Sequence, residues 1–334
     1  MVSIIIPVFN EKNYIKDCMK SVLSFDLQNE IKEIFLIDGG SNDGTIDIIL
    51  NFKLSDPRIH YLKNKKKYQS FALNKGIKFS KGKYIMRLDA HSIYPKNYLE
   101  RCLSVIQSTD ADNVGGVFIS KLKTKTYQEK IVQAITTHKF GVGNSNFRIK
   151  HSSGYARTVP FGFFKREVFD EIGLFNENLI RNQDFELNSR MIKNGLKIWL
   201  DSSIKVYYYN QTSFFNFLRK QFLWEGKYNI YMLKVAPYAF SLRHVITGVY
   251  AMATIFFIFL LQFSNIPLLV LVFSYSILAF ISSISQSIKY KNLSFIFVLP
   301  FCFFLFHFLH GLSQIIELIK ISKEKIINQN KARH

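Results

Sequence analysis

Short apolar runs alternate with amphipathic stretches along residues 1–235. The runs VSIIIPV (2–8), IKEIFLID (31–38) and YIMRLDA (84–90) have the composition of strands that are buried on both faces of a sheet. The intervening stretches, such as YIKDCMKSVL (14–23), carry apolar residues at helical spacing. This alternation predicts an α/β fold with a mainly parallel sheet between two layers of helices.

The pattern changes after His244, where three long apolar tracts follow one another at 245–263, 266–284 and 294–312. Each tract has about the 20 residues that a membrane-spanning helix needs, and none contains Asp, Glu, Lys or Arg. Because Pro300 divides the third tract, we expect either two or three hydrophobic helices in a membrane domain. A very apolar soluble helical domain is the alternative.

The sequence thus predicts three parts: a first domain at 1–235, a membrane domain at 244–318 and a basic tail at 319–334. At the end of the first domain, residues 214–234 mix aromatic side chains with Arg and Lys. This composition is typical of a helix that lies on an anionic lipid surface. An ordinary amphipathic helix packed on its own domain is the alternative.

Basic residues outnumber acidic ones, with 44 Lys and Arg against 24 Asp and Glu and a formal net charge of +20. This charge favours a polyanionic partner, either nucleic acid, a phosphorylated metabolite or an anionic membrane. The chain carries no recognised nucleic-acid motif, and a nucleic-acid binder would not explain the apolar tracts. Three scattered cysteines form no paired motif, which favours a reducing compartment.

Polar residues follow the predicted strands at their carboxyl ends, where parallel sheets bind ligands. They are Asn10 and Glu11, Asp38, and Asp89 with His91. If the strand continues past Leu88, its alternation places Asp89 and His91 on the same side. Carboxylates and one imidazole, together with diphosphate oxygens, suit Mn²⁺ or Mg²⁺. Taken singly, however, each acidic residue has a structural explanation as a helix cap or turn residue.

Five segments resemble the successive motifs of family 2 glycosyltransferases, which are inverting nucleotide-sugar enzymes with the GT-A fold. The segments are VSIIIPVFNE, FLIDGGSNDGT, QSFALNKGI, GKYIMRLDAHS and NQDFELNSRMIKNG. The DAH variant, the segment FGVGNSNFR and the apolar tracts most resemble membrane-bound enzymes that extend bacterial exopolysaccharide, of the succinoglycan type, on a lipid carrier. The resemblance implies a Rossmann-like GT-A catalytic domain with a mainly parallel sheet, followed by an α-helical membrane domain.

The resemblance also implies roles for matching residues. The nucleotide and donor sugar would be bound by Pro7, Asn10, Glu11, Asp38, Asp43, Gln69, Asn74 and Asp89. Asp89 and His91 occupy the two ends of the metal motif, which would hold Mn²⁺ or Mg²⁺. Asp184 matches the catalytic base. Three arginines are candidates for binding the phosphates of the acceptor: Arg148, Arg157 and Arg181. The alternative is that they lie in linkers without a ligand.

Three positions depart from the family pattern. His91 replaces the last aspartate of the metal motif, and Gln183 replaces the glutamate that usually precedes the base. Trp224 stands where the Gln-x-x-Arg-Trp motif of processive synthases has arginine. This last departure favours addition of a single sugar over processive synthesis.

The resemblance implies an inverting, metal-dependent glycosyltransferase that uses a nucleotide-sugar donor, preferably a UDP-sugar. The acceptor would be a polyprenyl-diphosphate-linked oligosaccharide in bacterial cell-surface polysaccharide synthesis. Membrane lipid is a further expected partner and nucleic acid is not. The catalytic domain would face the cytoplasm at the bacterial inner membrane. A membrane-tethered, catalytically inactive adaptor that binds nucleotide sugars is the alternative.

Overall fold

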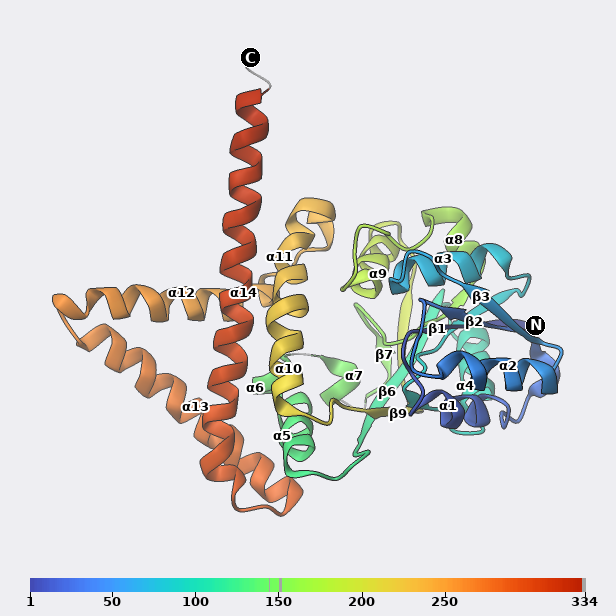
Figure 1. The fold of residues 1–334 in the computed structure, drawn as a ribbon, viewed down its shortest axis with the longest axis horizontal. Coiled ribbons are helices and arrows are strands. Elements are labelled where there is room, and N and C mark those ends of the chain that lie inside the picture. The colour runs from blue at the N-terminus through green and yellow to red at the C-terminus, as the bar shows by residue number, and fades with distance from the viewer. Residues whose placement is uncertain (144, 150–151, 332–334) are drawn as a thin grey trace. The chain divides into compact units, whose positions relative to one another are not determined.

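The computed structural model describes residues 1–143, 145–149 and 152–331 (Figure 1). Internal contacts divide the chain into two compact units. The sheet unit comprises Met1–Lys121 and Asn146–Tyr209, and the helical unit comprises Leu122–Ser145 and Asn210–His334. This division differs from the predicted boundary at residue 235, because 122–145 and 210–235 pack with the C-terminal helices.

Within the described residues, the sheet unit holds nine strands in one mixed sheet of order β3-β2-β1-β4-β8-β6-β9-β5, with β7 paired to β9. The strands are β1 (Val2–Val8), β2 (Ile31–Asp38), β3 (Ile59–Lys63), β4 (Tyr84–Arg87), β5 (Ser92–Ile93), β6 (Asn113–Lys121), β7 (Gly154–Tyr155), β8 (Phe163–Lys165) and β9 (Ile198–Tyr209). Strands β1 to β4 pair in parallel, as predicted. Strand β8 lies between β4 and β6 and is antiparallel to both, so the sheet is mixed.

Helices cover both faces of this sheet. They are α1 (Ile15–Val22), α2 (Thr45–Ser55), α3 (Gln69–Phe79), α4 (Tyr98–Ser108), α7 (Asn146–Ile149), α8 (Glu167–Ile172) and α9 (Gln183–Lys193). Strand alternation sends Ile4 and Ile6 of β1 into a core with α1 and α4. It sends Ile5 into a second core with α3 and α9. The predicted α/β layering is therefore confirmed.

Gly76 lets α3 approach strands β1 and β2 closely. A Cβ at this position would lie 2.6 Å from Ile5 Cγ2 and 2.8 Å from Ile37 Cδ1. We expect Gly76→Ala to destabilise the protein by about 1–3 kcal/mol, because overpacking outweighs the better helix propensity of alanine. Thermal unfolding of the full chain in detergent measures the change, with the exposed Lys78→Ala on the same helix as the control. A Gly76→Ala variant as stable as this control would contradict the tight packing.

The helical unit consists of α5 (Tyr127–Thr136), α6 (Lys139–Val142), α10 (Phe214–Lys220), a π turn (Gln221–Glu225), α11 (Gly226–Val235), α12 (Ile246–Phe259), α13 (Ile266–Tyr290) and α14 (Phe295–Lys331), with short 3₁₀ turns between some of them. Among the described residues, α13 and α14 are long and apolar enough to cross a membrane, whereas α12 is shorter. Pro300 does not divide the third tract as expected, because α14 continues through it. Leu299 and Phe303 are fully buried on either side of the proline, and their packing offsets its missing hydrogen bond.

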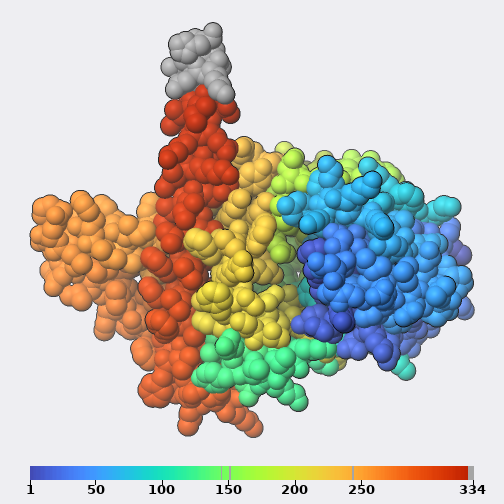
Figure 2. Space-filling view, in the orientation of Figure 1, coloured from blue at the N-terminus to red at the C-terminus, as the bar shows by residue number. Residues whose placement is uncertain are grey.

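Helices α12 and α13 expose large apolar side chains. Phe259 of α12 is 66% exposed, and Phe273 and Ile281 of α13 are 69% and 61% exposed. The space-filling view shows α12 and α13, in orange, standing out from α14, in red (Figure 2). Because lipid is the medium in which such a surface is stable, these helices support membrane association of the chain.

The predicted interfacial segment 214–234 forms α10, the π turn and most of α11. Phe217 and Ile230 are buried within the helical unit. Gly226 lies against the backbone carbonyl of His310, and this small residue lets α11 pack closely on α14. Arg219 and Lys234 remain exposed, and Lys234 Nζ donates to Glu324 Oε2 of α14 at 2.6 Å. One face of the segment thus packs on its own unit, while Arg219 and Lys234 remain accessible.

Candidate active site

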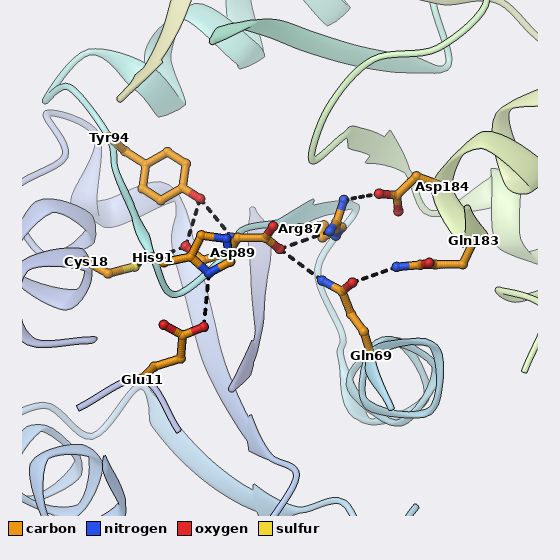
Figure 3. Close-up of polar contacts among 9 residues, drawn as sticks. All are labelled: Glu11, Cys18, Gln69, Arg87, Asp89, His91, Tyr94, Gln183 and Asp184. Atoms are coloured by element: carbon orange, nitrogen blue, oxygen red, sulfur yellow. Dashed lines mark hydrogen bonds and ion pairs between the residues drawn. The ribbon is translucent and has the colours of Figure 1, made fainter. Parts of the chain in front are cut away.

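Arg87 lies at the centre of a polar cluster at the carboxyl end of β4 (Figure 3). Its Nη1 donates to Asp184 Oδ2 at 2.6 Å, and its Nη2 donates to Asp89 Oδ1 at 2.9 Å. The Arg87 side chain is 5% exposed, while those of Asp89 and Asp184 are 15% and 33% exposed. One guanidinium therefore joins the aspartate of the predicted metal motif to the predicted base.

Two glutamines connect the same residues along a second route. Gln69 is the first residue of α3 and Gln183 the first residue of α9. Gln183 Nε2 donates to Gln69 Oε1 at 2.6 Å, and Gln69 Nε2 donates to Asp89 Oδ1 at 3.0 Å. The two helix N-termini are thus tied to the end of β4 from one side (Figure 3).

His91 binds a different carboxylate. Its Nδ1 lies 3.0 Å from Glu11 Oε1, and the rings of Tyr208 and Tyr14 pack edge-on against the imidazole. Burial acts to lower the pKa of His91, but the negative potential of Tyr208 and the Glu11 carboxylate outweigh it and raise the pKa to about 9. The Glu11 carboxylate therefore favours the protonated imidazole.

Strand β4 ends at Arg87, and residues 90–91 form a turn. The strand therefore does not continue to His91, and alternation does not place Asp89 and His91 on the same side. Tyr94 holds this turn. The Asp89 N–H donates to the Tyr94 hydroxyl at 2.8 Å, and that hydroxyl lies 3.2 Å from the Asp89 carbonyl oxygen. Cys18 Sγ also lies 3.6 Å from this carbonyl oxygen. Backbone contacts, and not strand alternation, set the directions of the two side chains.

The loops that follow β1 and β2 are joined by hydrogen bonds. The Asn10 N–H donates to Ser41 Oγ at 2.8 Å, and the Asn42 N–H donates to Asn10 Oδ1 at 2.9 Å. Asp38 is 2% exposed and accepts hydrogen bonds from the N–H groups of Gly40 and Ser41. The predicted nucleotide-binding residues Asn10 and Asp38 therefore lie at one edge of the sheet.

Asp43 and Glu11 belong to the same pair of loops. Burial acts to raise the pKa of Asp43, but hydrogen bonds from the Thr45 hydroxyl and from the backbone N–H groups of Lys12 and Thr45 outweigh it and lower the pKa. The Glu11 N–H donates to Thr45 Oγ1 at 2.9 Å. Pro7 lies in β1 opposite Ile37 of β2. The carboxylate of Asp43 thus stabilises the turn that leads into α2.

Other predicted residues lie apart from this cluster. Asn74 is buried on α3 and bonds the backbone N–H and carbonyl of Phe175, each at 2.9 Å. The Arg148 guanidinium lies 5.0 Å from the ring centre of Phe118. Arg157 is exposed in the loop between β7 and β8, and Arg181 is half-buried just before α9. The segment 140–158 contains α6, α7 and β7, and its residues 144, 150 and 151 lie outside the described part of the chain.

Sequence reasoning missed Arg87 and Tyr94 as members of the site. Arg87 carried a signal, because it is the one charged residue in the apolar run YIMRL. A charge inside a buried strand is costly unless a partner neutralises it, so its position already implied a nearby carboxylate. Tyr94 carried no comparable signal.

The residues present fit a divalent cation that the donor helps to hold. Among the described residues, no three His, Cys, Asp or Glu side chains form a complete metal cage. Asp89 and the Nε2 atom of His91 would supply two ligands, and diphosphate oxygens and water would supply the rest. Once His91 loses a proton, Nδ1–H donates to Glu11, which is the arrangement that orients metal-ligating imidazoles. The nearby positive charge of Arg87 acts against cation binding.

The comparisons with known proteins agree with this fold. Residues 3–173, more than half of the chain, match the family described as Glycosyl transferase family 2. A structure of GalNAc-T7 with UDP, GalNAc and Mn²⁺ is 17% identical, with a TM-score of 0.50, and the match covers 72% of this chain and 51% of that chain. This likeness identifies the GT-A fold.

Two curated relatives extend the comparison. One is the dolichyl N-acetyl-alpha-D-glucosaminyl phosphate 3-beta-D-2,3-diacetamido-2,3-dideoxy-beta-D-glucuronosyltransferase of Methanococcus voltae, 29% identical over 324 residues, with 92% of this chain and 93% of the relative covered. The other is the succinoglycan biosynthesis protein ExoA of Rhizobium meliloti, 32% identical over 208 residues, with 62% of each chain covered. The chain therefore belongs to glycosyl transferase family 2, and its GT-A fold is followed by apolar helices long enough to cross a membrane.

Proposed function

We propose that the protein is an inverting, metal-dependent glycosyltransferase that moves one sugar from a nucleoside-diphosphate sugar, preferably a UDP-sugar, to a polyprenyl-diphosphate-linked oligosaccharide. The observation that carries the proposal is the pair of aspartates, Asp89 and Asp184, held at one sheet edge by Arg87. The relative from Methanococcus voltae is a sugar transferase on a dolichyl phosphate, and ExoA acts in succinoglycan biosynthesis. Both names support a lipid-linked or polysaccharide acceptor.

Asp184 is the proposed general base. It lies in the first turn of α9, and one third of its side chain is exposed, so an acceptor hydroxyl can reach it. In a single in-line displacement, the acceptor oxygen bonds to the anomeric carbon while the bond from that carbon to the diphosphate breaks. The hydroxyl proton passes to the Asp184 carboxylate. The displacement needs no covalent nucleophile, and it inverts the anomeric configuration.

The donor end of the site would bind the cation, the diphosphate and the base of the nucleotide. When bound, the cation would neutralise the charge that grows on the leaving diphosphate. Asp89 and His91 would hold it, with Glu11 orienting His91 and Gln69 orienting Asp89. The Asp38 carboxylate keeps acceptor capacity beyond its two backbone bonds and would receive an N–H of the base.

The helical unit is the proposed membrane anchor. Helices α13 and α14 would cross the bilayer, and the exposed Arg219 and Lys234 would lie against anionic headgroups. The same basic residues suit the diphosphate of the lipid-linked acceptor. We place the protein in the bacterial inner membrane with its sheet unit on the cytoplasmic side, where the positive-inside rule favours the basic loop 289–292.

Donor turnover tests the proposal. Purified full-length protein in detergent, with Mn²⁺ and a bacterial polyprenyl-lipid extract, is offered a panel of UDP-, GDP- and dTDP-sugars. Release of the nucleoside diphosphate from one donor, dependent on both metal and lipid, is the expected result. If the protein binds a nucleotide sugar but releases nucleoside diphosphate from none of the donors, it is the catalytically inactive adaptor and not an enzyme.

The pH dependence of kcat reports on the proposed base. Burial raises the pKa of Asp184, and the Arg87 guanidinium opposes this by stabilising the anion, with a net rise above the ordinary aspartate value. The active form is the carboxylate, so we expect kcat to fall as the pH drops through this raised pKa. The acidic limb should therefore lie at higher pH than the ordinary aspartate pKa near 3.9 would give. A flat kcat down to pH 4 would contradict the assignment.

A further inference from the structure

We propose that Arg87 is a positioning residue that aims one oxygen of each aspartate at its reaction partner. The proposal rests on the proposed glycosyltransferase function and assigns a role that the family motifs did not give to this residue. Arg87 bonds Oδ2 of Asp184 and Oδ1 of Asp89 through separate nitrogens of one planar group. The two carboxylates are 95 positions apart in the sequence, and this guanidinium sets them in one arrangement.

The pattern of hydrogen bonds leaves one oxygen of each carboxylate for chemistry. Arg87 and Gln69 both donate to Oδ1 of Asp89, and within the described residues no further donor meets its Oδ2. Arg87 likewise takes Oδ2 of Asp184, and among the same residues Oδ1 accepts no hydrogen bond. Asp89 Oδ2 is then directed to the cation, and Asp184 Oδ1 to the acceptor hydroxyl. A planar guanidinium that bonds both carboxylates fixes such directions better than a point charge does.

The fold itself immobilises Arg87. Its backbone N–H donates to the Gly162 carbonyl at 3.1 Å, and its guanidinium lies 5.5 Å from the ring centre of Phe161. Phe161 and Gly162 have φ values of 65° and 72°. Such backbone is costly for phenylalanine and persists only where the surroundings demand it. The strained Phe161 backbone brings its ring over the guanidinium and limits the movement of the guanidinium.

Because Arg87 is positively charged, a positioning role and a metal-binding role predict different effects of its removal. A cation at Asp89 is repelled by the guanidinium, so removing that charge leaves cation affinity unchanged or raises it. Gln69 still bonds Asp89 Oδ1 in its absence and preserves much of the carboxylate's orientation. Within the described part of the chain, Asp184 has no such second donor, so it would lose its fixed direction. The effect of losing Arg87 should therefore fall on kcat, not on the donor KM.

Steady-state kinetics of Arg87→Met and Arg87→Lys in the full chain test this. We expect Arg87→Met to lower kcat by about 100-fold, since a misplacement of about 1 Å costs that much. The donor KM and the half-saturating Mn²⁺ concentration should stay within about threefold of wild type or fall. Lysine keeps the charge but reaches one carboxylate at a time, so Arg87→Lys should recover about tenfold of the lost kcat.

Arg166→Met is the matched control, because Arg166 is a half-buried arginine of the same unit that bonds Gly82 and Ser80. It should keep the wild-type kcat. The double variant Arg87→Met, Asp184→Asn separates lost positioning from lost folding. Its kcat should be no lower than that of Asp184→Asn alone, because the two residues act as a unit. Thermal unfolding compares all variants.

Three results would overturn the proposal: a wild-type kcat in Arg87→Met, a loss carried by KM and Mn²⁺ alone, or multiplicative losses in the double variant. Each of these results can be obtained only if the wild-type protein transfers sugar. Wild-type protein that transfers none would overturn the proposed function instead, and the Arg87 role would fall with it.

Discussion

Asp184→Asn is expected to lower kcat for sugar transfer by about 10³-fold, with the donor KM nearly unchanged. General base catalysis contributes about 10²–10⁴-fold, and asparagine keeps the shape of the side chain while losing the proton-accepting carboxylate. The asparagine oxygen still meets Arg87 Nη1, so the site should remain assembled. Asp184 touches neither of the proposed metal ligands directly, which is why binding of the donor should survive.

The measurement is steady-state transfer with saturating donor and acceptor lipid. Asp170→Asn, at an exposed position of α8, is the control for removing one aspartate charge from the same unit. It should behave as wild type. An Asp184→Asn enzyme with more than a tenth of the wild-type kcat would exclude Asp184 as the base. A similar rise in the KM of both substrates would instead indicate a binding role.

Asp89→Ala should abolish metal-dependent turnover, with kcat/KM reduced by at least about 100-fold. Loss of an outer partner of a metal ligand costs about 10–100-fold, and loss of the ligand itself should cost more. The substitution also leaves buried Arg87 with Asp184 as its remaining carboxylate partner and removes the acceptor of Gln69. Both changes weaken the positioning of the donor diphosphate.

Chelation provides the matched test of the metal. Treatment with EDTA should remove turnover from the wild-type protein, and added Mn²⁺ or Mg²⁺ should restore it. Asp89→Ala should not regain activity at any cation concentration below about 100 times that which half-saturates the wild type. Full activity in EDTA, or an Asp89→Ala variant that matches wild type, would exclude the proposed cation site.

The amphipathic pattern of the chain predicted the part of the site that depends on strand ends. β1, β2 and β4 are apolar runs with clear limits, and parallel pairing brings their carboxyl ends together. Glu11 and His91 are thus close in the structure although 80 positions separate them. The position of these residues follows from local pattern and the geometry of parallel sheets.

The pairing of Arg87 with Asp184 did not follow from the pattern. The two residues are 97 positions apart, and the short strand β8, with three residues, gives no periodicity that would show how β4 meets the later part of the chain. Similarly, α5 packs within the helical unit, and the amphipathic pattern of a helix does not reveal which unit it packs on. Local sequence patterns do not predict residue pairs that are brought together by tertiary packing.

Transfer of labelled sugar into lipid tests whether the protein is a glycosyltransferase with a lipid-linked acceptor. Full-length protein in detergent receives Mn²⁺, a radiolabelled nucleotide sugar and a bacterial polyprenyl-lipid extract, beside Asp184→Asn under the same conditions. We expect label in the organic-extractable fraction with the wild type, and almost none with the variant. Label that stays in water while the nucleoside diphosphate is released, or equal lipid labelling by both proteins, would contradict the proposal.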